Sequence, residues 1–282
     1  MFKICLHQLR TAWGSGRFYL GLFLGCAIHI SGILPLQEYA AGIGRHLGIG
    51  EGFIYFCCER YALSAAFLGI VFLVSDIPFS SENETYTLLR VSRRKWLAGK
   101  VLYLSAVCIL FYLAVFLAGA AFLSGNAFGG NFWSEPFYYL ARGMIVEDCS
   151  AYFPYPHILL LCPAQAVLAG FALAYGYGFV MSLFLFFCNL KLPKTLGYAA
   201  VMLVHAVFYM VPGVFQSSYY ARYSLLGQSL LMYHSVQGEY GELLPSLRQS
   251  FMVFGGVTVV LLLFIFKSIR GYDFRITVGT RQ

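Results

Sequence analysis

Charged residues are scarce in this sequence of 282 residues, since Asp, Glu, Lys and Arg together make up only 11%. Soluble domains carry about 25% charged residues. A water-soluble fold built from 60% apolar residues would also leave much apolar surface in contact with water. The scarcity of charge therefore excludes an ordinary soluble enzyme, and it favours a bilayer, which solvates an apolar exterior.

The sequence also lacks the short motifs that carry hydrolytic, metal or nucleotide chemistry. None of its six His residues lies in an H-E-x-x-H pattern, no G-x-S-x-G elbow occurs, and no carboxylate dyad falls in facing apolar runs. Gly99-Lys100 has no partner glycine upstream, so no P-loop is present. The eight cysteines form no C-x-x-C pair. We therefore expect no enzymatic activity, no metal and no cofactor on this chain.

Long apolar runs are what the sequence has instead. A helix needs about 20 apolar residues to cross the hydrocarbon core of a bilayer. Six stretches qualify or nearly so, at 18–36, 61–77, 101–123, 164–188, 196–215 and 249–266. Because these runs lack the period-two alternation of barrel strands, they predict an all-α integral membrane protein with six transmembrane helices. No repeat or low-complexity linker divides the chain, so a single domain, 1–282, accounts for all of it.

The fourth run is too long for one straight helix. Apolar residues 158–162 extend it upstream of Pro163. Because proline removes a helical hydrogen bond, we expect a break or a partly embedded lead-in segment at Pro163.

The positions of the basic residues predict the orientation. With the N-terminus inside, 14 of the 19 Lys and Arg residues fall on the inner side. The outer side then holds Arg45, Arg60, Arg142, Arg222 and Arg248. The sequence therefore predicts a multi-pass cell-membrane protein with both termini in the cytoplasm. The net charge of +7 is explained by the inner loops, without nucleic acid as a partner.

Three peripheral segments carry their own patterns. Residues 1–13 place apolar and basic side chains on different faces, which predicts an interfacial helix. The outer segment 126–157 is crowded with aromatic residues and is expected to lie against the membrane surface. The outer segment 216–248 has apolar residues at helical spacing and predicts short helices before the last span. A disulfide among the outer Cys57, Cys58 and Cys149 stays open.

The inner loop between the second and third spans predicts a short helix. Ser81 followed by Glu84 is a capping box. Glu82 adds a second acid at the helix start, and Arg90 places a cation near its end, as the helix dipole favours. Ser92 can cap the third span. A helix of about two turns is marginal in water, so its apolar residues need cover from the membrane surface or a partner.

This loop carries a family resemblance. The order of an acidic pair, a Thr, Leu88-Leu89, Ser92-Arg93 and Gly99-Lys100 resembles the permeases of type-two ATP-binding cassette (ABC) transporters. In that family the loop is the coupling helix, which docks into a groove on the ATP-hydrolysing subunit. The resemblance extends to the six spans, the N-terminal helix and the final outer segment, which forms short re-entrant helices in the family. The chain departs from it at Glu84-Thr85, where the family often has a Gly near the Thr.

The resemblance implies partners and a mechanism. A separate ATPase subunit would hold ATP and Mg, and a second permease copy or a sister permease would complete the membrane unit, in contact with membrane lipid. Closure of the ATPases would push the coupling helix and export an amphipathic or hydrophobic substrate by alternating access. The residues implied to couple are Glu82, Glu84, Thr85, Tyr86, Leu88, Leu89, Arg90 and Arg93.

Other functions stay open on the sequence alone. A secondary transporter or channel would work without an ATPase partner. Against it, the spans contain few ionisable groups and no obvious inverted repeat. A non-transporting anchor or assembly subunit is a further alternative.

Four polar residues within the apolar runs are candidates for a pathway or for packing, because polar groups are costly in lipid. Asp76 is expected to snorkel or cap at the inner end of its span. His29, Gln165 and His205 are expected either to form interhelical hydrogen bonds or to contact substrate. The G-x-x-x-G step at Gly21 and Gly25 predicts close helix packing or dimerisation.

Overall fold

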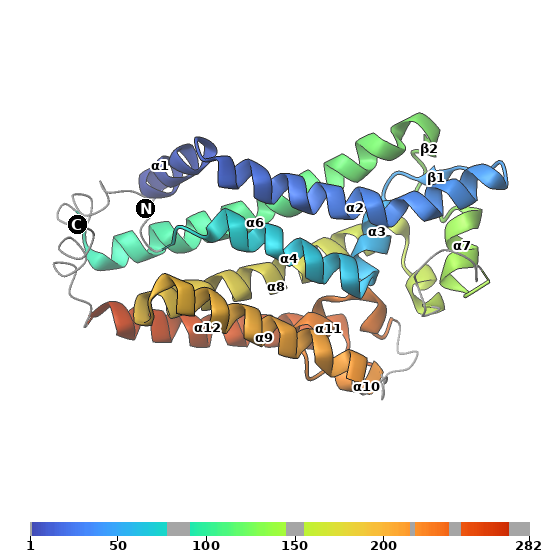
Figure 1. The fold of residues 1–282 in the computed structure, drawn as a ribbon. Coiled ribbons are helices and arrows are strands. Elements are labelled where there is room, and N and C mark those ends of the chain that lie inside the picture. The colour runs from blue at the N-terminus through green and yellow to red at the C-terminus, as the bar shows by residue number, and fades with distance from the viewer. Residues whose placement is uncertain (1, 78–90, 145–154, 215–217, 237–243, 271–282) are drawn as a thin grey trace.

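The computed structural model describes residues 2–77, 91–144, 155–214, 218–236 and 244–270. Long helices run side by side (Figure 1). They are α2 (Gly16–Gly42), α4 (Arg60–Val74), α6 (Arg93–Leu123), α8 (Pro163–Lys191), α9 (Lys194–Val214) and α12 (Leu247–Arg270). We call the two ends of the bundle the α1 end, where α1 (Phe2–Trp13) lies, and the α7 end, where α7 (Glu135–Ala141) lies.

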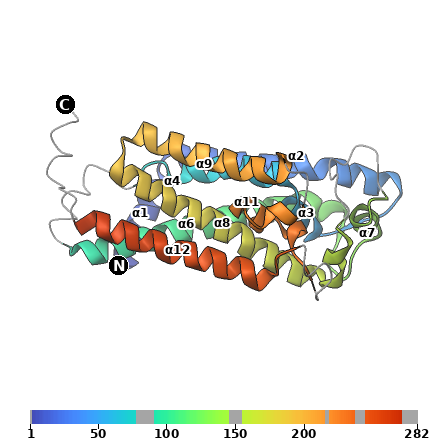
Figure 2. The same cartoon turned by 90° about the horizontal axis from the view of Figure 1, so that it is seen from below.

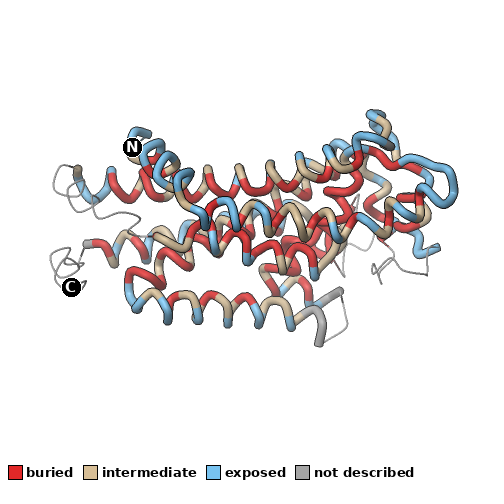
Figure 3. The backbone as a smooth tube through the Cα atoms, turned by 45° about the horizontal axis from the view of Figure 1, so that its top comes forward, coloured by how far each residue is buried: buried red, intermediate tan, exposed pale blue. Residues whose placement is uncertain are grey.

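The long helices have the length and composition of membrane spans. In the described residues, α2, α6, α8, α9 and α12 are each long and apolar enough to cross a membrane. The pair α3 (Glu51–Cys58) and α4 makes a sixth candidate, bent by 91°. Large apolar side chains face outward, such as Phe23 (70% exposed), Leu203 (66%) and Leu263 (64%). Buried residues line the middle of the bundle (Figure 3). The predicted all-α fold is therefore confirmed, and the described residues provide five or six candidate membrane spans.

The second predicted span, 61–77, is not one straight crossing helix. The helix α4 has 15 residues, a length of about 22 Å at 1.5 Å per residue, which is short of the roughly 30 Å of hydrocarbon. Glu59, between α3 and α4, has an extended backbone (φ −85°, ψ 116°), and its side chain accepts the Ala62 amide. The bend therefore has its own N-cap, a feature that hydropathy does not detect.

The third span begins earlier than the predicted 101–123. The helix α6 starts at Arg93, after Ser92 in the expected N-cap position, although the Ser92 side chain makes no capping hydrogen bond. Lys100, predicted to lie in the inner loop, is fully buried two turns into α6, with its Nζ 5.5 Å from the Trp96 ring centroid. The loop prediction for Lys100 is therefore wrong, because the apolar run understates the length of the helix.

The break at Pro163 is confirmed. A 3₁₀ segment, η2 (Pro156–Leu160), precedes α8, and α8 begins at Pro163 itself. Proline suits this first helical position, where no intrahelical partner for an N–H exists.

In Figure 2, α12 lies alongside α8, so the last span packs on the central one.

The G-x-x-x-G step packs within the chain. A Cβ at Gly21 would lie 2.6 Å from the carbonyl oxygen of Gly69 in α4, and a Cβ at Gly69 would lie 2.6 Å from the carbonyl oxygen of Gly21. A Cβ at Gly25 would lie 2.4 Å from the ring of Phe111 in α6. The two glycines of the step therefore let α2 approach α4 and α6, which accounts for the motif without a dimer contact.

A buried carboxylate organises the α7 end. Glu51 is 1% exposed and accepts hydrogen bonds from Gly48 N (2.8 Å), Ser134 N (2.6 Å) and Ser134 Oγ (2.6 Å). These bonds tie α3 to the parallel strands β1 (Leu47–Gly48) and β2 (Ala127–Phe128), which follows η1 (Ser124–Asn126), and to the start of α7. Trp133 and Phe137 stack at 4.8 Å, and Phe137 is fully buried. The described part of 126–157 thus folds onto the protein itself.

Short helices precede the last span, as expected. They are α10 (Ser218–Ala221), α11 (Leu225–Ser229) and η3 (Leu231–Tyr233), and α11 packs against α8 and α9. Beyond η3, the buried His234 donates from Nδ1 to Leu230 O (3.0 Å), and its Nε2 accepts from Ser250 Oγ (2.9 Å). Burial lowers the pKa of His234 to about 4. Its neutral ring therefore fastens this segment to α12 at neutral pH.

The predicted N-terminal helix is present as α1. It contacts α6 through a face that buries Cys5 and Gln8, while Phe2 (75%) and Leu6 (57%) are exposed. The apolar face expected from residues 1–13 is therefore divided between protein packing and an outward surface.

The cysteine pair at the end of α3 is not available at the outer surface. Cys57 and Cys58 are both free and buried, at 0% and 1% exposure. A disulfide between these two thiols is therefore absent, and Cys149 lies outside the described residues.

We predict that Gly21→Val lowers the free energy of unfolding of the detergent-purified protein by about 1–3 kcal/mol, because backbone atoms cannot yield to the new side chain. Its melting temperature should fall accordingly. Gly32→Val on the same helix is the control, since nothing lies within 4 Å of a Cβ there. Differential scanning fluorimetry in detergent measures both. Equal melting temperatures for the two variants would contradict the close crossing of α2 and α4.

Candidate functional site at the root of segment 78–90

Seven of the eight predicted coupling residues lie outside the described residues, in segment 78–90. They are Glu82, Glu84, Thr85, Tyr86, Leu88, Leu89 and Arg90. The structure does describe where this segment leaves and rejoins the bundle. We call Ser75, Asp76 and Ile77 the N-terminal root, and Arg93 and Arg94 the C-terminal root.

The N-terminal root is set by how α4 ends. The amide and the hydroxyl of Ser75 both donate to the carbonyl of Phe72, at 3.4 and 2.9 Å. The amide of Ile77 donates to the carbonyl of Val74 at 3.2 Å. These turn bonds satisfy the last carbonyls of the helix and direct the chain out of the bundle.

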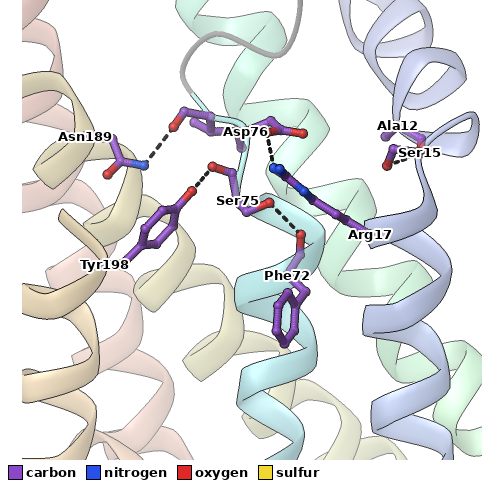
Figure 4. A network of polar contacts seen from close by, with 9 residues as sticks. Ala12, Ser15, Arg17, Phe72, Ser75, Asp76, Asn189 and Tyr198 are labelled. Atoms are coloured by element: carbon purple, nitrogen blue, oxygen red, sulfur yellow. Dashed lines mark hydrogen bonds and ion pairs between the residues drawn. The ribbon is translucent and has the colours of Figure 1, made fainter. Parts of the chain in front are cut away.

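Three other helices contact this root (Figure 4). Asn189 Nδ2 in α8 donates to Ile77 O at 2.8 Å, and the hydroxyl of Tyr198 in α9 donates to Ser75 O. Arg17 in α2 pairs with Asp76 at 2.9 Å. The root is therefore fastened to α2, α8 and α9 at once, and Asp76, expected to snorkel or cap, has a charged partner.

The Arg17–Asp76 and Asn189–Ile77 contacts differ in strength. The Arg17 and Asp76 side chains are 63% and 42% exposed, and such an ion pair contributes about 0–1 kcal/mol. The Asn189 bond is buried, so its loss strands the Ile77 carbonyl, at a cost of about 1–3 kcal/mol. Gly197 in α9 makes room for it, since a Cβ there would lie 2.1 Å from Asn189 Oδ1. Asn189 therefore fastens this root more strongly than the Arg17–Asp76 pair does.

The C-terminal root is fastened to the last helix. Arg93 Nη1 donates to the carbonyl of Ile269 at 3.1 Å, and the Arg94 guanidinium lies 5.8 Å from the Phe266 ring centroid. Ile269 lies in the last turn of α12, where free carbonyls and the helix dipole both favour a cation. Arg93, predicted as a coupling residue, thus joins α6 to α12.

His205 forms hydrogen bonds between helices, which is one of the two roles expected for it. Its Nε2 lies 2.8 Å from Ser64 Oγ in α4, and its Nδ1 lies 2.5 Å from the Tyr177 hydroxyl in α8. The ring also stacks on Phe67, with the centroids 4.4 Å apart. If Tyr177 donates to Nδ1, then Nε2–H donates to Ser64, and all three groups are satisfied. That tautomer leaves no free base to activate Ser64.

The other two candidates have different surroundings. His29 is 1% exposed, and neither ring nitrogen has a hydrogen-bond partner. The ring instead packs edge-on to Phe53 and Phe56. The interhelical hydrogen bond predicted as one role of His29 is therefore not formed with any described residue. Gln165 is exposed, and its Oε1 accepts from the amide of Cys162 at 3.3 Å, as part of the cap of α8. The four candidates therefore do not meet in one pathway.

Within the described residues, no cluster of three or more His, Cys, Asp or Glu side chains could hold a metal ion. The contacts of Asn189 and Tyr198 with the N-terminal root were not predicted, since a polar residue near the end of an apolar run gives no signal of its partner. It could have found Arg17 and Asp76, which are opposite charges at the same predicted end of adjacent spans.

No protein-family model, no curated protein and no solved structure matches the chain significantly.

We predict that Asn189→Ala destabilises the protein by about 1–3 kcal/mol, whereas Asp76→Asn costs less than about 1 kcal/mol. The reason is that the first change strands a buried carbonyl and the second removes an exposed ion pair. Melting temperatures in detergent, compared at one ionic strength, measure the difference. A larger loss for Asp76→Asn than for Asn189→Ala would show that we have ranked the contacts wrongly.

Proposed function

We propose that this chain is the membrane-embedded permease subunit of an ABC transporter of the type-two class. The observation that supports this proposal most is the pair of roots. Both ends of segment 78–90 are fastened to helices other than their own, namely α2, α8 and α9 on one side and α12 on the other. A force on this segment would therefore act on most of the bundle.

The partner in this proposal is a separate ATP-hydrolysing subunit. The chain has no P-loop, so ATP and Mg would be held by that subunit. Residues 82–90 would dock on it as a coupling helix, and a second permease copy or a sister permease would complete the complex. The transported molecule would be amphipathic or hydrophobic and would be exported by alternating access, since the spans offer few charges to an ion.

A secondary transporter or channel is the second candidate. The buried His205 bridge supports it most, because ionisable groups inside a membrane bundle often mark proton or ion pathways. Its two neighbours already satisfy the ring, which favours a structural role for His205.

Affinity purification of the tagged protein in mild detergent tests the proposal. We expect an ATP-binding subunit to copurify with it in stoichiometric amount. The double substitution Glu84→Lys with Leu88→Lys should abolish this copurification, because it reverses a charge and removes an apolar contact in the proposed docking helix. Glu38→Lys, an equal charge reversal on an exposed position of α2, should leave it unchanged. Purification of the chain alone, with no ATPase, would favour the secondary transporter or channel.

The proposed orientation predicts which thiols are reached from outside. Cys162 caps α8 at the α7 end, and hydrogen bonding, led by the Gln165 amide, lowers the pKa of its thiol. In a variant whose only cysteine is Cys162, an impermeant maleimide should label intact cells. A cysteine-free protein carrying Thr11→Cys, at the α1 end, should be labelled only after permeabilisation. The opposite pattern would place the α1 end outside.

A further inference from the structure

An arginine at the start of α4 lies against two tyrosine rings. The guanidinium carbon of Arg60 is 5.2 Å from the ring centroid of Tyr61 and 4.9 Å from that of Tyr209 in α9. The two rings are 5.9 Å apart and inclined by 61°, and Arg60 Nη2 lies 3.4 Å from the Tyr61 hydroxyl. These contacts hold the cation in place by cation–π attraction.

Among the described residues, no carboxylate lies within salt-bridge distance of Arg60, and its neighbour Glu59 gives it a Coulombic attraction without an ion pair. The ion pairs in which both partners belong to the described residues are Arg17–Asp76 and Arg45–Glu135. Glu59, the neighbour in sequence, uses its carboxylate to accept the Ala62 amide. A guanidinium has five N–H donors, and the hydroxyl of Tyr61 is the acceptor that the described residues offer it. Arg60 therefore has donors that no hydrogen bond or ion pair with the described residues uses.

The cluster lies where the lipid-facing surface ends. Leu203, Val207 and Met210 of α9 are 66%, 52% and 57% exposed, and the candidate span of α9 ends at Val211. Tyr209 is two residues from that end, Tyr61 is 58% exposed, and Arg60 is the first residue of α4, which adjoins α3 toward the α7 end (Figure 1). Tyrosine and arginine at the end of a span lie at the depth of the lipid headgroups.

We propose that Arg60, with Tyr61 and Tyr209, binds the phosphate group of a membrane phospholipid. A phosphate supplies two oxygens that match the planar fork of a guanidinium, and the bond is charge-assisted. The rings fix the fork, and the exposed apolar side chains of α9 lie beside the acyl chains. The two ring contacts argue against a side chain that simply extends into water. This inference depends on the membrane fold and not on an ATPase partner.

Native mass spectrometry of the detergent-purified protein with added phosphatidylglycerol tests the proposal. We expect Arg60→Gln to weaken binding by about tenfold, through loss of a charge-assisted contact. Arg60→Lys should give an intermediate affinity, because it keeps the charge and loses the fork. Arg142→Gln is the matched control, since Arg142 lies 4.5 Å from the Tyr138 ring at the end of α7, outside any candidate span.

Three further outcomes would overturn the proposal. An affinity of Arg60→Gln for phosphatidylglycerol equal to that of the wild type would overturn it. If Arg60→Gln does not fold, unchanged affinity for this lipid in both Arg60→Lys and Tyr209→Leu would overturn it instead. Equal retention of a galactolipid without phosphate would exclude phosphate recognition. Full displacement of the lipid by millimolar inorganic phosphate would indicate a site for a free anion. Size-exclusion profiles matching the wild type show that the variants compared are folded.

Discussion

No water reaches the hydrocarbon core of a bilayer, so a polar group there must find its partner inside the protein or remain unsatisfied at a cost. This constraint explains where the polar side chains of this bundle lie. Ser64 and Tyr177 share His205 across three helices, and Ser105 lies 2.8 Å from the Tyr175 hydroxyl across α6 and α8. Such bonds tie together helices whose apolar surfaces give little preference for one another over lipid. His29 is an exception, because its ring packs against Phe53 and Phe56 and neither ring nitrogen has a hydrogen-bond partner among the described residues.

The same constraint separates the two ends of the molecule. Charged groups collect where water is available, but at the α7 end the carboxylate of Glu51 is turned inward and is satisfied by three donors. That arrangement builds a folded cap from α3, β1, β2 and α7. At the α1 end the corresponding contacts instead converge on the two roots of segment 78–90. The cap joins short elements whose hydrogen-bonded residues, Glu51 and Ser134, are 83 positions apart in the chain, whereas the roots join long helices to one another.

Hydropathy predicted what depends on composition and run length, and it failed where a partner decides the structure. The apolar runs located every long helix, the amphipathic pattern located α1, and Pro163 located the break before α8. Run length could not show that a bend at Glu59 precedes 61–77, since α3 is nearly as apolar as α4. Nor could it show that Lys100 is buried, or that Asn189 bonds to Ile77, because such contacts join residues far apart in the sequence. Of the candidate site, the position was predictable, and so was the Arg17–Asp76 pair, whereas its other fastenings were not.

The helix α4 connects the features that matter most for the proposals. Its first residue, Arg60, belongs to the cluster proposed to bind phosphate, and its C-terminal end leads into the root that Asn189, Tyr198 and Arg17 hold. Between them, Gly69 lies so close to Gly21 that a Cβ on either residue would clash with the backbone of the other helix. A helix of 15 residues is short and stiff. The Arg60 cluster and the N-terminal root therefore lie at opposite ends of one short helix, and the Gly21–Gly69 contact holds that helix against α2 between them.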